Sequence, residues 1–270
     1  MTGLPIHIRA LQVVMLRLSI DPAWGTRLYA GQPSERVIDL SGGPYTLTDA
    51  DLELIRAVDR RAWTTDRYRR ARLVQSVVQE YSVTTAMMGV PVVDRFFGTA
   101  AFAHVLGHRG SMAEGFGDWV VTQASGGQRD IARLESTVCR ARRGERPPGT
   151  GYVTRPGCEG VALPEGTLAA WQEGTATLGG NPVAAAAEGR RWTPPPLGKA
   201  IEHLLIERQA SGGLGVHVLS AGVVGLLEFC RRPRSRSALN RQARRLRIGK
   251  KEVGKVLRRM LSEDMLIEQA

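Results

Sequence analysis

Two histidines four residues apart are the clearest candidates for chemistry in this sequence of 270 residues. His104 and His108 lie in the run Ala-Phe-Ala-His-Val-Leu-Gly-His, and their spacing puts both on one face of a helix, where they can share a metal ion. A third ligand is not adjacent in the sequence, although Asp94 or Glu114 can lie close in the fold. Because such histidines are more often ordinary surface or partly buried residues, the sequence predicts no metal site here.

The sequence contains no familiar catalytic motif. It has no GxGxxG that opens a helix, no GxxxxGK[ST], no GxSxG and no HExxH. The carboxylates of Asp49, Asp51 and Glu53 are typical of the first turn of a helix, where they stabilise the helix dipole. No catalytic constellation emerges from these residues, and we expect no cofactor. A free-standing metal-binding or hydrolytic enzyme that uses His104 and His108 is kept as a further alternative.

The composition indicates a folded cytoplasmic protein. Hydrophobic residues make up 43% of the chain and charged residues 23%, which is ordinary globular usage. No apolar run approaches the roughly 20 residues of a membrane span, and residues 1–20 do not predict a signal peptide. The cysteines Cys139, Cys158 and Cys230 form no CxxC pair, so we expect no disulfides, no structural zinc and a reducing compartment.

The positive charge is concentrated in one segment near the C-terminus. The whole chain carries a net charge of +11, whereas residues 231–259 hold thirteen Arg or Lys and one acidic residue, Glu252, which gives +12. The rest of the chain therefore sums to −1. Such a segment is typical of a surface that binds nucleic acid or an acidic peptide, and a solvated arginine face is the simpler alternative.

Helical signals dominate the first half of the chain. Thr48-Asp49-Ala50-Asp51 predicts a helix start, because a carboxylate follows a capping hydroxyl at the third residue. A second helix is expected from about Asp66 towards Met88-Gly89, and shorter helical pieces follow as far as Trp119.

The middle of the chain changes character. Residues 144–196 are rich in Pro and Gly turn signals, between which 151–154 and 160–163 are candidates for short strands. We therefore expect a mostly helical domain at 1–143, a connecting region at 144–196 and a C-terminal domain at 197–270.

The C-terminal part has the pattern of a hairpin followed by three helices. The runs 202–207 and 215–219 flank the turn Ser211-Gly212-Gly213, and apolar residues at helical spacing come after them. The predicted fold class is α+β, with a helical N-terminal domain and a winged-helix-like module in which a small antiparallel sheet precedes three helices.

This order of elements permits two kinds of binding. Three helices that end in a short strand are the plan of a DNA-binding winged helix, although the hairpin precedes the helices and no aromatic residues accompany the basic ones. Alternatively, the sheet edge at strand 215–219 accepts an extended peptide as an extra strand, beside the third helix. The second use requires no catalytic residues.

The C-terminal motifs resemble a known module. The segments 203–207, 216–220, 223–227 and 265–267 are similar in order and hydrophobic pattern to the precursor-peptide recognition element (RRE). This is the small winged-helix-like module of ribosomal-peptide maturation, as in the peptide chaperone of pyrroloquinoline quinone biosynthesis. That family binds a leader peptide as an added strand beside its third strand and a helix.

A second set of motifs lies in the N-terminal half, at Asp66–Arg72, Glu80–Val83, Met88-Gly89, Phe96-Phe97, Ser111 and Phe116–Trp119. These motifs resemble the helical domain of the partner proteins of multinuclear non-heme iron oxidative enzymes. The methanobactin partner subunit and the partner from thiaglutamate biosynthesis belong to that group. Its members often have Pro where this sequence has Ser82, and relatives of the domain have been labelled DNA-binding proteins.

Together the two resemblances imply a non-catalytic partner protein. Such a partner carries no iron; it binds the leader of a ribosomal precursor peptide and docks on the iron-dependent oxidase as a heterodimer, so that the core peptide reaches the metal. The alternative is a DNA-binding winged-helix-like regulator that uses residues 231–259.

Carried onto this sequence, the resemblance implies a leader-binding site on strand and third helix at Val216, His217, Val218, Leu219, Lys251, Gly254, Lys255 and Arg258. Gly254 costs about 1 kcal/mol relative to alanine within a helix, and it permits the close approach of a strand or of another helix. Tyr68, Arg69 and Arg72 are candidates for contact with the oxidase or the core peptide, or for hydrogen bonds within their own domain.

Overall fold

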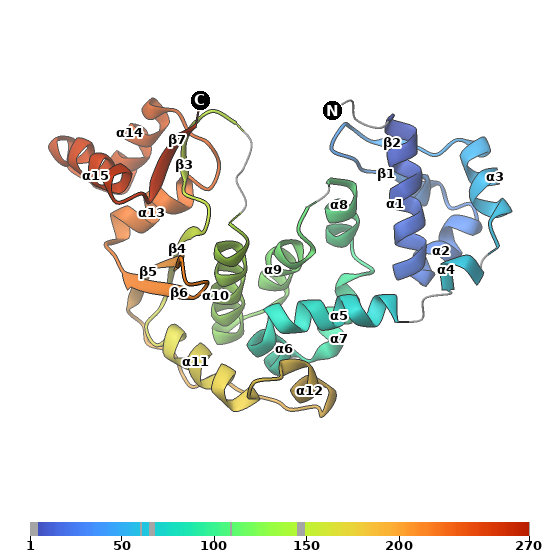
Figure 1. Cartoon of the computed structure of the whole chain (residues 1–270), viewed down its shortest axis with the longest axis horizontal. Coiled ribbons are helices and arrows are strands. Elements are labelled where there is room, and N and C mark those ends of the chain that lie inside the picture. The colour runs from blue at the N-terminus through green and yellow to red at the C-terminus, as the bar shows by residue number, and fades with distance from the viewer. Residues whose placement is uncertain (1–4, 60, 65–67, 109, 145–148, 270) are drawn as a thin grey trace. The chain divides into compact units, whose positions relative to one another are not determined.

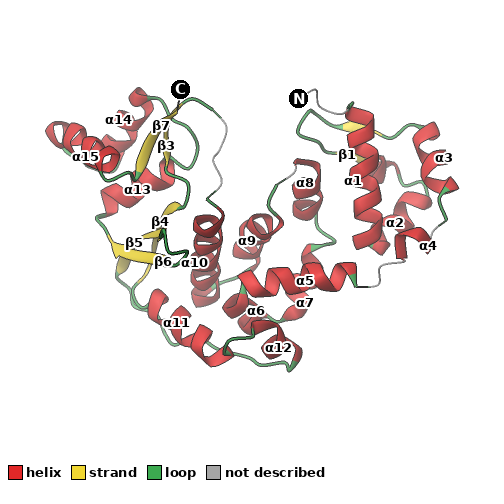
Figure 2. Ribbon diagram, in the orientation of Figure 1, coloured by secondary structure: helices red, strands yellow, loops and turns green. Residues whose placement is uncertain are grey.

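The computed structural model describes residues 5–59, 61–64, 68–108, 110–144 and 149–269 (Figure 1). The fold is α+β and mostly helical, with small antiparallel sheets, which confirms the predicted class (Figure 2). None of the described helices is both long and apolar enough to cross a lipid bilayer.

The first of two compact units holds residues 1–123 and 175–192. It is almost entirely helical and contains α1 (Ile6–Ile20), α2 (Pro22–Tyr29), a 3-10 turn (Pro33–Arg36), β1 (Val37–Ile38), β2 (Tyr45–Thr46), α3 (Asp49–Ala57), α4 (Arg61–Thr64), α5 (Arg69–Glu80), α6 (Ser82–Met88), α7 (Val90–Phe96), α8 (Ala100–His108), α9 (Met112–Gln123) and α12 (Pro182–Ala187).

Local signals explain several helix ends in this unit. Thr48 and Asp51 form the reciprocal capping box that was predicted at the start of α3. The helix expected to run from Asp66 to Met88-Gly89 is two helices, because the backbone at Tyr81 leaves the helical region between α5 and α6. Asp66 itself lies outside the described residues.

The second half of this unit is built around an aromatic cluster. Phe96 makes edge-on contacts with Phe97, Phe102 and Phe116, with ring centroids 5.5 to 5.6 Å apart. These rings come from α7, α8 and α9 and from the residue after α7, and they are fully buried. The cluster therefore holds α8 in place, and α8 carries His104 and His108.

The second unit holds residues 124–174 and 193–270. It contains α10 (Gly126–Arg143), β3 (Gly151–Thr154), β4 (Cys158–Pro164), α11 (Thr167–Leu178, whose last residues belong to the first unit), β5 (Ile201–Arg208), β6 (Leu214–Val218), α13 (Ala221–Phe229), α14 (Arg236–Arg245), α15 (Lys250–Ser262) and β7 (Leu266–Gln269).

Two small antiparallel sheets organise this unit. One has the strand order β4-β5-β6, and the other pairs β3 with β7. The predicted hairpin is confirmed, since β5 and β6 pair in the register Leu204↔Val218 and Ile206↔Val216. One face of the larger sheet packs on Leu134 and Val138 of α10. The core on its other face is made with α13, α14 and α15.

The two units cut across the predicted boundaries at 143/144 and 196/197. The helix α10 belongs to the second unit because it packs on β4 and β5, and α12 belongs to the first because it packs on α5 and α6. The Pro/Gly-rich region is therefore no simple connection: it supplies two strands to one unit and a helix to the other.

Candidate functional site

The strand β6 lies at the edge of the three-stranded sheet, paired with β5 on one side. Alternate residues of an antiparallel strand direct their backbone N–H and C=O groups to opposite sides. The N–H of Leu219 donates to the carbonyl oxygen of His203 at 2.8 Å, so Leu219 and His217 face β5. Val216 and Val218 consequently direct their backbone groups away from the sheet, and no hydrogen bond to these groups occurs among the described residues.

The side chains of Val216 and Val218 form an exposed apolar strip along this edge. Val218 is 74% exposed and Val216 is 36% exposed. Both lie opposite buried residues of β5, Leu204 and Ile206, and therefore on the sheet face that packs on α10. An extended segment that pairs with β6 would cover both valines and form hydrogen bonds with their free backbone groups.

The other face of β6 is polar at its centre. The imidazole Nε2 of His217 lies 3.0 Å from Oε1 of Glu207, and Nη2 of Arg155 lies 3.1 Å from Oε2 of the same carboxylate. His217 lies opposite Leu205, and Glu207 is two residues further along β5, so the side chains of His217 and Glu207 are on the same face of the sheet. A peptide at this edge would thus meet apolar side chains on one face and a His–Glu–Arg group on the other.

Leu219 has a structural role. Its side chain is partly buried against the core that includes Leu226, Leu239 and Val253, and its N–H continues the ladder to β5. It holds the end of β6 in place and does not form part of the exposed strip.

The four helical residues predicted to face β6 lie on α15. Lys251, Lys255 and Arg258 are exposed, and a side chain at Gly254 would meet open space. The helix α15 packs on α14 and β7. Its residues Val253, Leu257 and Met260 are buried in the core of this unit. Leu219, at the end of β6, packs against the core that contains Val253 and Leu257 of α15, and close packing does not account for Gly254. A leader-binding groove between β6 and α15 stays a prediction.

Part of the basic segment is used within the protein. Arg231 donates from Nε to Glu159 at 2.9 Å and from Nη2 to the carbonyl oxygen of Gly160 at 2.9 Å. The guanidinium of Arg234 lies 4.6 Å from the ring centroid of Phe229. The exposed cations that remain lie mostly on α14 and α15.

The small sheet beside these helices gives them a winged-helix-like arrangement. The final strand β7 pairs with β3, and Tyr152 of β3 also forms a bridge with Arg234, between α13 and α14. The predicted hairpin, β5 and β6, precedes the helices and does not supply the strand that pairs with β7. The partner strand comes from the Pro/Gly-rich region instead.

Tyr68, Arg69 and Arg72 lie in the first unit, where α5 begins. Tyr68 is 72% exposed, while Nη1 of Arg69 donates to Oγ of Ser19 at 2.8 Å. Arg69 also lines an apolar pocket of about 450 Å³, together with Leu73 of α5 and with residues of α1 and α8. Arg69 thus has contacts within its own unit, as one of the two predictions for it stated.

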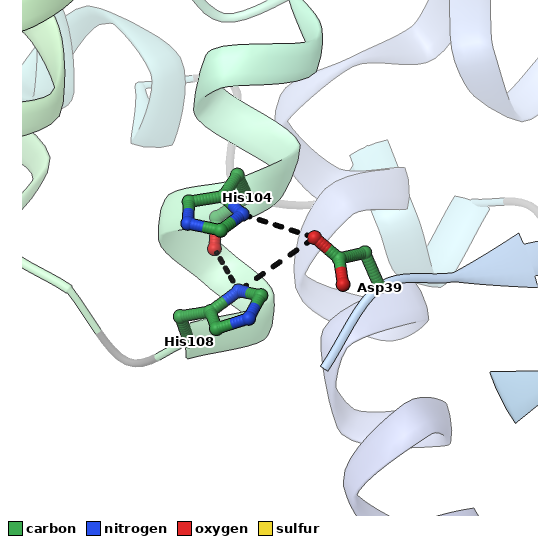
Figure 3. Close-up of side chains that lie close together, drawn as sticks. All are labelled: Asp39, His104 and His108. Carbon is green, nitrogen blue, oxygen red and sulfur yellow. Dashed lines mark hydrogen bonds and ion pairs between the residues drawn. The ribbon is translucent and has the colours of Figure 1, made fainter. Parts of the chain in front are cut away.

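The structure gives His104 and His108 a third neighbour that was not predicted from the sequence. Asp39, which follows β1, places its carboxylate beside both imidazoles (Figure 3). Asp94, which was considered for this place, instead pairs with Arg70 at 2.7 Å. A contact between residues 39 and 104 leaves no local signal in the sequence.

The three cysteines are buried, and none of them forms a disulfide. Burial raises the pKa of Cys158 to about 11 and that of Cys230 to about 12. Both thiols are therefore neutral at physiological pH and poor nucleophiles.

Comparison of the chain with protein-family models and with curated proteins gives no match, so the function is inferred from the geometry above and from the resemblance of the motifs.

Proposed function

We propose that this chain is a non-catalytic partner protein that binds the leader of a ribosomally made precursor peptide and presents its core to an iron-dependent oxidative enzyme. The observation that carries this proposal is the open edge of β6. Outward-facing backbone groups and exposed apolar side chains occur together there, at Val216 and Val218.

The order of elements supports the proposal. A three-stranded antiparallel sheet, β4-β5-β6, precedes α13, α14 and α15 along the chain, and β6 is its third strand. The RRE family, which the C-terminal motifs resemble, receives its leader beside the third strand. In this chain α15 packs on α14 and β7, and Leu219 at the end of β6 packs against the same core.

The physical advantage of such a partner is a gain in effective concentration. A leader held as an added strand turns the encounter between core peptide and enzyme into an intramolecular step. Main-chain hydrogen bonds supply affinity with little demand on sequence, and the side-chain surroundings of β6 supply selectivity. A cytoplasmic location is part of this proposal and agrees with three buried cysteines that form no disulfide.

Co-purification tests the proposal. The untagged chain is expressed with the tagged oxidase from a neighbouring gene, with and without the precursor peptide encoded beside them. We expect a one-to-one complex that the precursor peptide tightens. Absence of a complex, together with no binding of a fluorescein-labelled leader to the purified chain, would contradict the proposal.

Binding of duplex nucleic acid is a second candidate, favoured by the three helices next to the β3–β7 sheet and by the exposed cations of α14 and α15. It predicts affinity for random-sequence duplex DNA that falls steeply with salt. Charge reversal at Arg244 and Arg258 would weaken that binding, and reversal at Arg244, which lies outside the implied leader site, would leave leader binding unchanged. Duplex affinity that is independent of salt, or unaffected by both reversals, would contradict this candidate.

A further inference from the structure

We infer that Asp39, His104 and His108 form a binding site for a divalent transition-metal ion such as Zn²⁺. Each of the three offers one ligand atom, and these atoms lie within 4.8 Å of one another in the described residues. The site lies in the first unit and shares no residue with the peptide-binding edge of β6. It is therefore independent of the proposed function.

The fold brings Asp39 to this place through one glycine. Gly107 is buried on α8, and a Cβ there would overlap the backbone carbonyl oxygen of Asp39. The N–H of Ser41 also donates to the carbonyl oxygen of Gly107 at 3.3 Å. Only a residue without a side chain allows the segment after β1 to cross α8 at this point, between the two histidines.

The helix spacing sets the two imidazoles side by side. The rings of His104 and His108 stack with their centroids 3.8 Å apart and their planes 26° apart. Figure 3 shows the Nδ1 atoms of both rings directed toward one oxygen of Asp39. Three donors thus converge on one point beside the helix.

The separations of the donors suit a metal ion. Nδ1 of His104 lies 3.0 Å and Nδ1 of His108 lies 3.8 Å from Oδ2 of Asp39. Neighbouring ligands of a tetrahedral ion with bonds of roughly 2.0–2.1 Å lie about 3.3 Å apart, which falls between these two distances. Small changes in the side-chain torsions would equalise them.

Nδ1 of His108 also lies 3.0 Å from the backbone carbonyl oxygen of His104. Metal coordination through this nitrogen replaces that hydrogen bond and requires the tautomer protonated at Nε2. The competition limits the affinity but does not block the site, because the carbonyl oxygen belongs to the helix and keeps its own helical partner.

The donor set and the exposure select the class of ion. Two imidazoles and a carboxylate suit Zn²⁺, Fe²⁺, Co²⁺ or Ni²⁺, whereas Mg²⁺ and Ca²⁺ prefer oxygen ligands alone. The side chains of His104 and Asp39 are 61% and 58% exposed, so water can complete the coordination sphere. The site is therefore of the open, three-ligand kind.

Titration with Co²⁺ and Zn²⁺ tests the inference. The full-length chain, with any affinity tag removed, is stripped with a chelator and titrated with Co²⁺ in an absorption spectrometer and with Zn²⁺ in a calorimeter. We expect one ion per chain and cobalt d–d bands typical of nitrogen and oxygen ligands. His104→Ala, His108→Ala and Asp39→Asn should each weaken binding by about tenfold or more.

Matched controls separate this site from other surface residues. His217→Gln removes an exposed histidine that is paired with Glu207, and Asp49→Asn removes an exposed carboxylate; both should leave the affinity unchanged. Asp39→Asn keeps the size of the side chain, and circular dichroism reports whether the fold is retained. Absence of Co²⁺ binding, or binding that Asp39→Asn and His104→Ala leave intact, would overturn the inference.

Discussion

The two edges of the three-stranded sheet differ in whether their outward backbone groups have hydrogen-bond partners. On β4, the outward N–H of Cys158 donates to the carbonyl oxygen of Arg155, and the outward carbonyl of Gly160 accepts from Arg231 at 2.9 Å. On β6, the outward backbone groups of Val216 and Val218 have no such partner among the described residues.

Edge strands invite pairing with other chains, and proteins usually protect them with charged side chains, bulges or covering segments. Here β4 is covered, with Arg231 fixed by Glu159 and with α10 and α13 packed against the strand. The strand β6 ends in an exposed valine instead of a lysine or a proline. On β4 the N–H of Cys158 and the carbonyl of Gly160 are thus already paired within the chain, whereas the outward groups of Val216 and Val218 are open among the described residues.

The largest expected effect comes from proline at the open edge. Val218→Pro removes an N–H that points away from β5, so the hairpin keeps its own ladder while an added strand loses a donor. We expect leader affinity to fall by about 100-fold or more, measured by fluorescence anisotropy with a labelled leader. The far-ultraviolet circular dichroism spectrum should not change.

The matched control is proline on the closed edge. Ala162 occupies an outward-facing position of β4, as Val218 does on β6. Ala162→Pro should leave leader affinity within about twofold of the original. Equal losses in both variants would show that the two edges do not differ in peptide binding.

The next effect concerns stability at the closed edge. Arg231→Met removes the donors to Glu159 and Gly160, and this should lower the free energy of unfolding by about 1–3 kcal/mol in urea titrations. Arg259→Met breaks an exposed pair with Glu263 at 2.6 Å and should cause no measurable change. An Arg231→Met variant as stable as the original chain would mean that this arginine does not hold the edge.

Local patterns predicted the open edge better than the closed one. The apolar run of β5, the Ser-Gly-Gly turn and the alternation in β6 are adjacent in the chain, so the hairpin followed from turn and strand propensities. The remaining strand of the sheet, β4, is separated from β5 by α11 and α12. Its pairing depends on tertiary packing, which short-range patterns do not encode.

The same limit explains what was missed at the two sites. Apolar residues at helical spacing predicted the third helix, which carries Lys251, Lys255 and Arg258, but this spacing carries no information on which strand lies nearby. His104 and His108 were found from their spacing, whereas Asp39 reaches them only because Gly107 lets a distant segment cross the helix. The helices before Thr48 were also missed, although Asp21-Pro22 is a recognisable helix start with the Asp21 carboxylate accepting from the N–H of Trp24.

A smaller effect distinguishes the contribution of the Val218 side chain to leader affinity from the contribution of its backbone. Val218→Thr keeps the branched shape and the backbone groups but adds a hydroxyl to a strip that a bound peptide would cover. We expect a loss of leader affinity of about fivefold, close to 1 kcal/mol. The control is Val37→Thr, at a residue of β1 that is 50% exposed, which should have no effect. An unchanged affinity in Val218→Thr would mean that binding depends on the backbone alone.

The smallest effect is the dependence of stability on pH that Cys158 causes at the closed edge. Burial raises the pKa of Cys158 to about 11, so its thiol stays protonated in the folded chain at pH values where the unfolded chain ionises. The protonated thiol therefore contributes to the free energy of unfolding. This contribution is complete below about pH 9 and is lost as the pH rises from there through 11. The urea midpoint should therefore fall over that range, and less so in Cys158→Ala.

The rate at which the Cys158 thiol is modified also tests whether Arg231 covers β4. At pH 8 the native thiols should react slowly with a disulfide reagent. If Arg231 keeps β4 closed, Arg231→Met should speed the modification of Cys158 a few-fold and leave that of Cys139 unchanged. Equal rates in the variant and the original chain would place the protection of Cys158 in the packing of α13 rather than in the arginine.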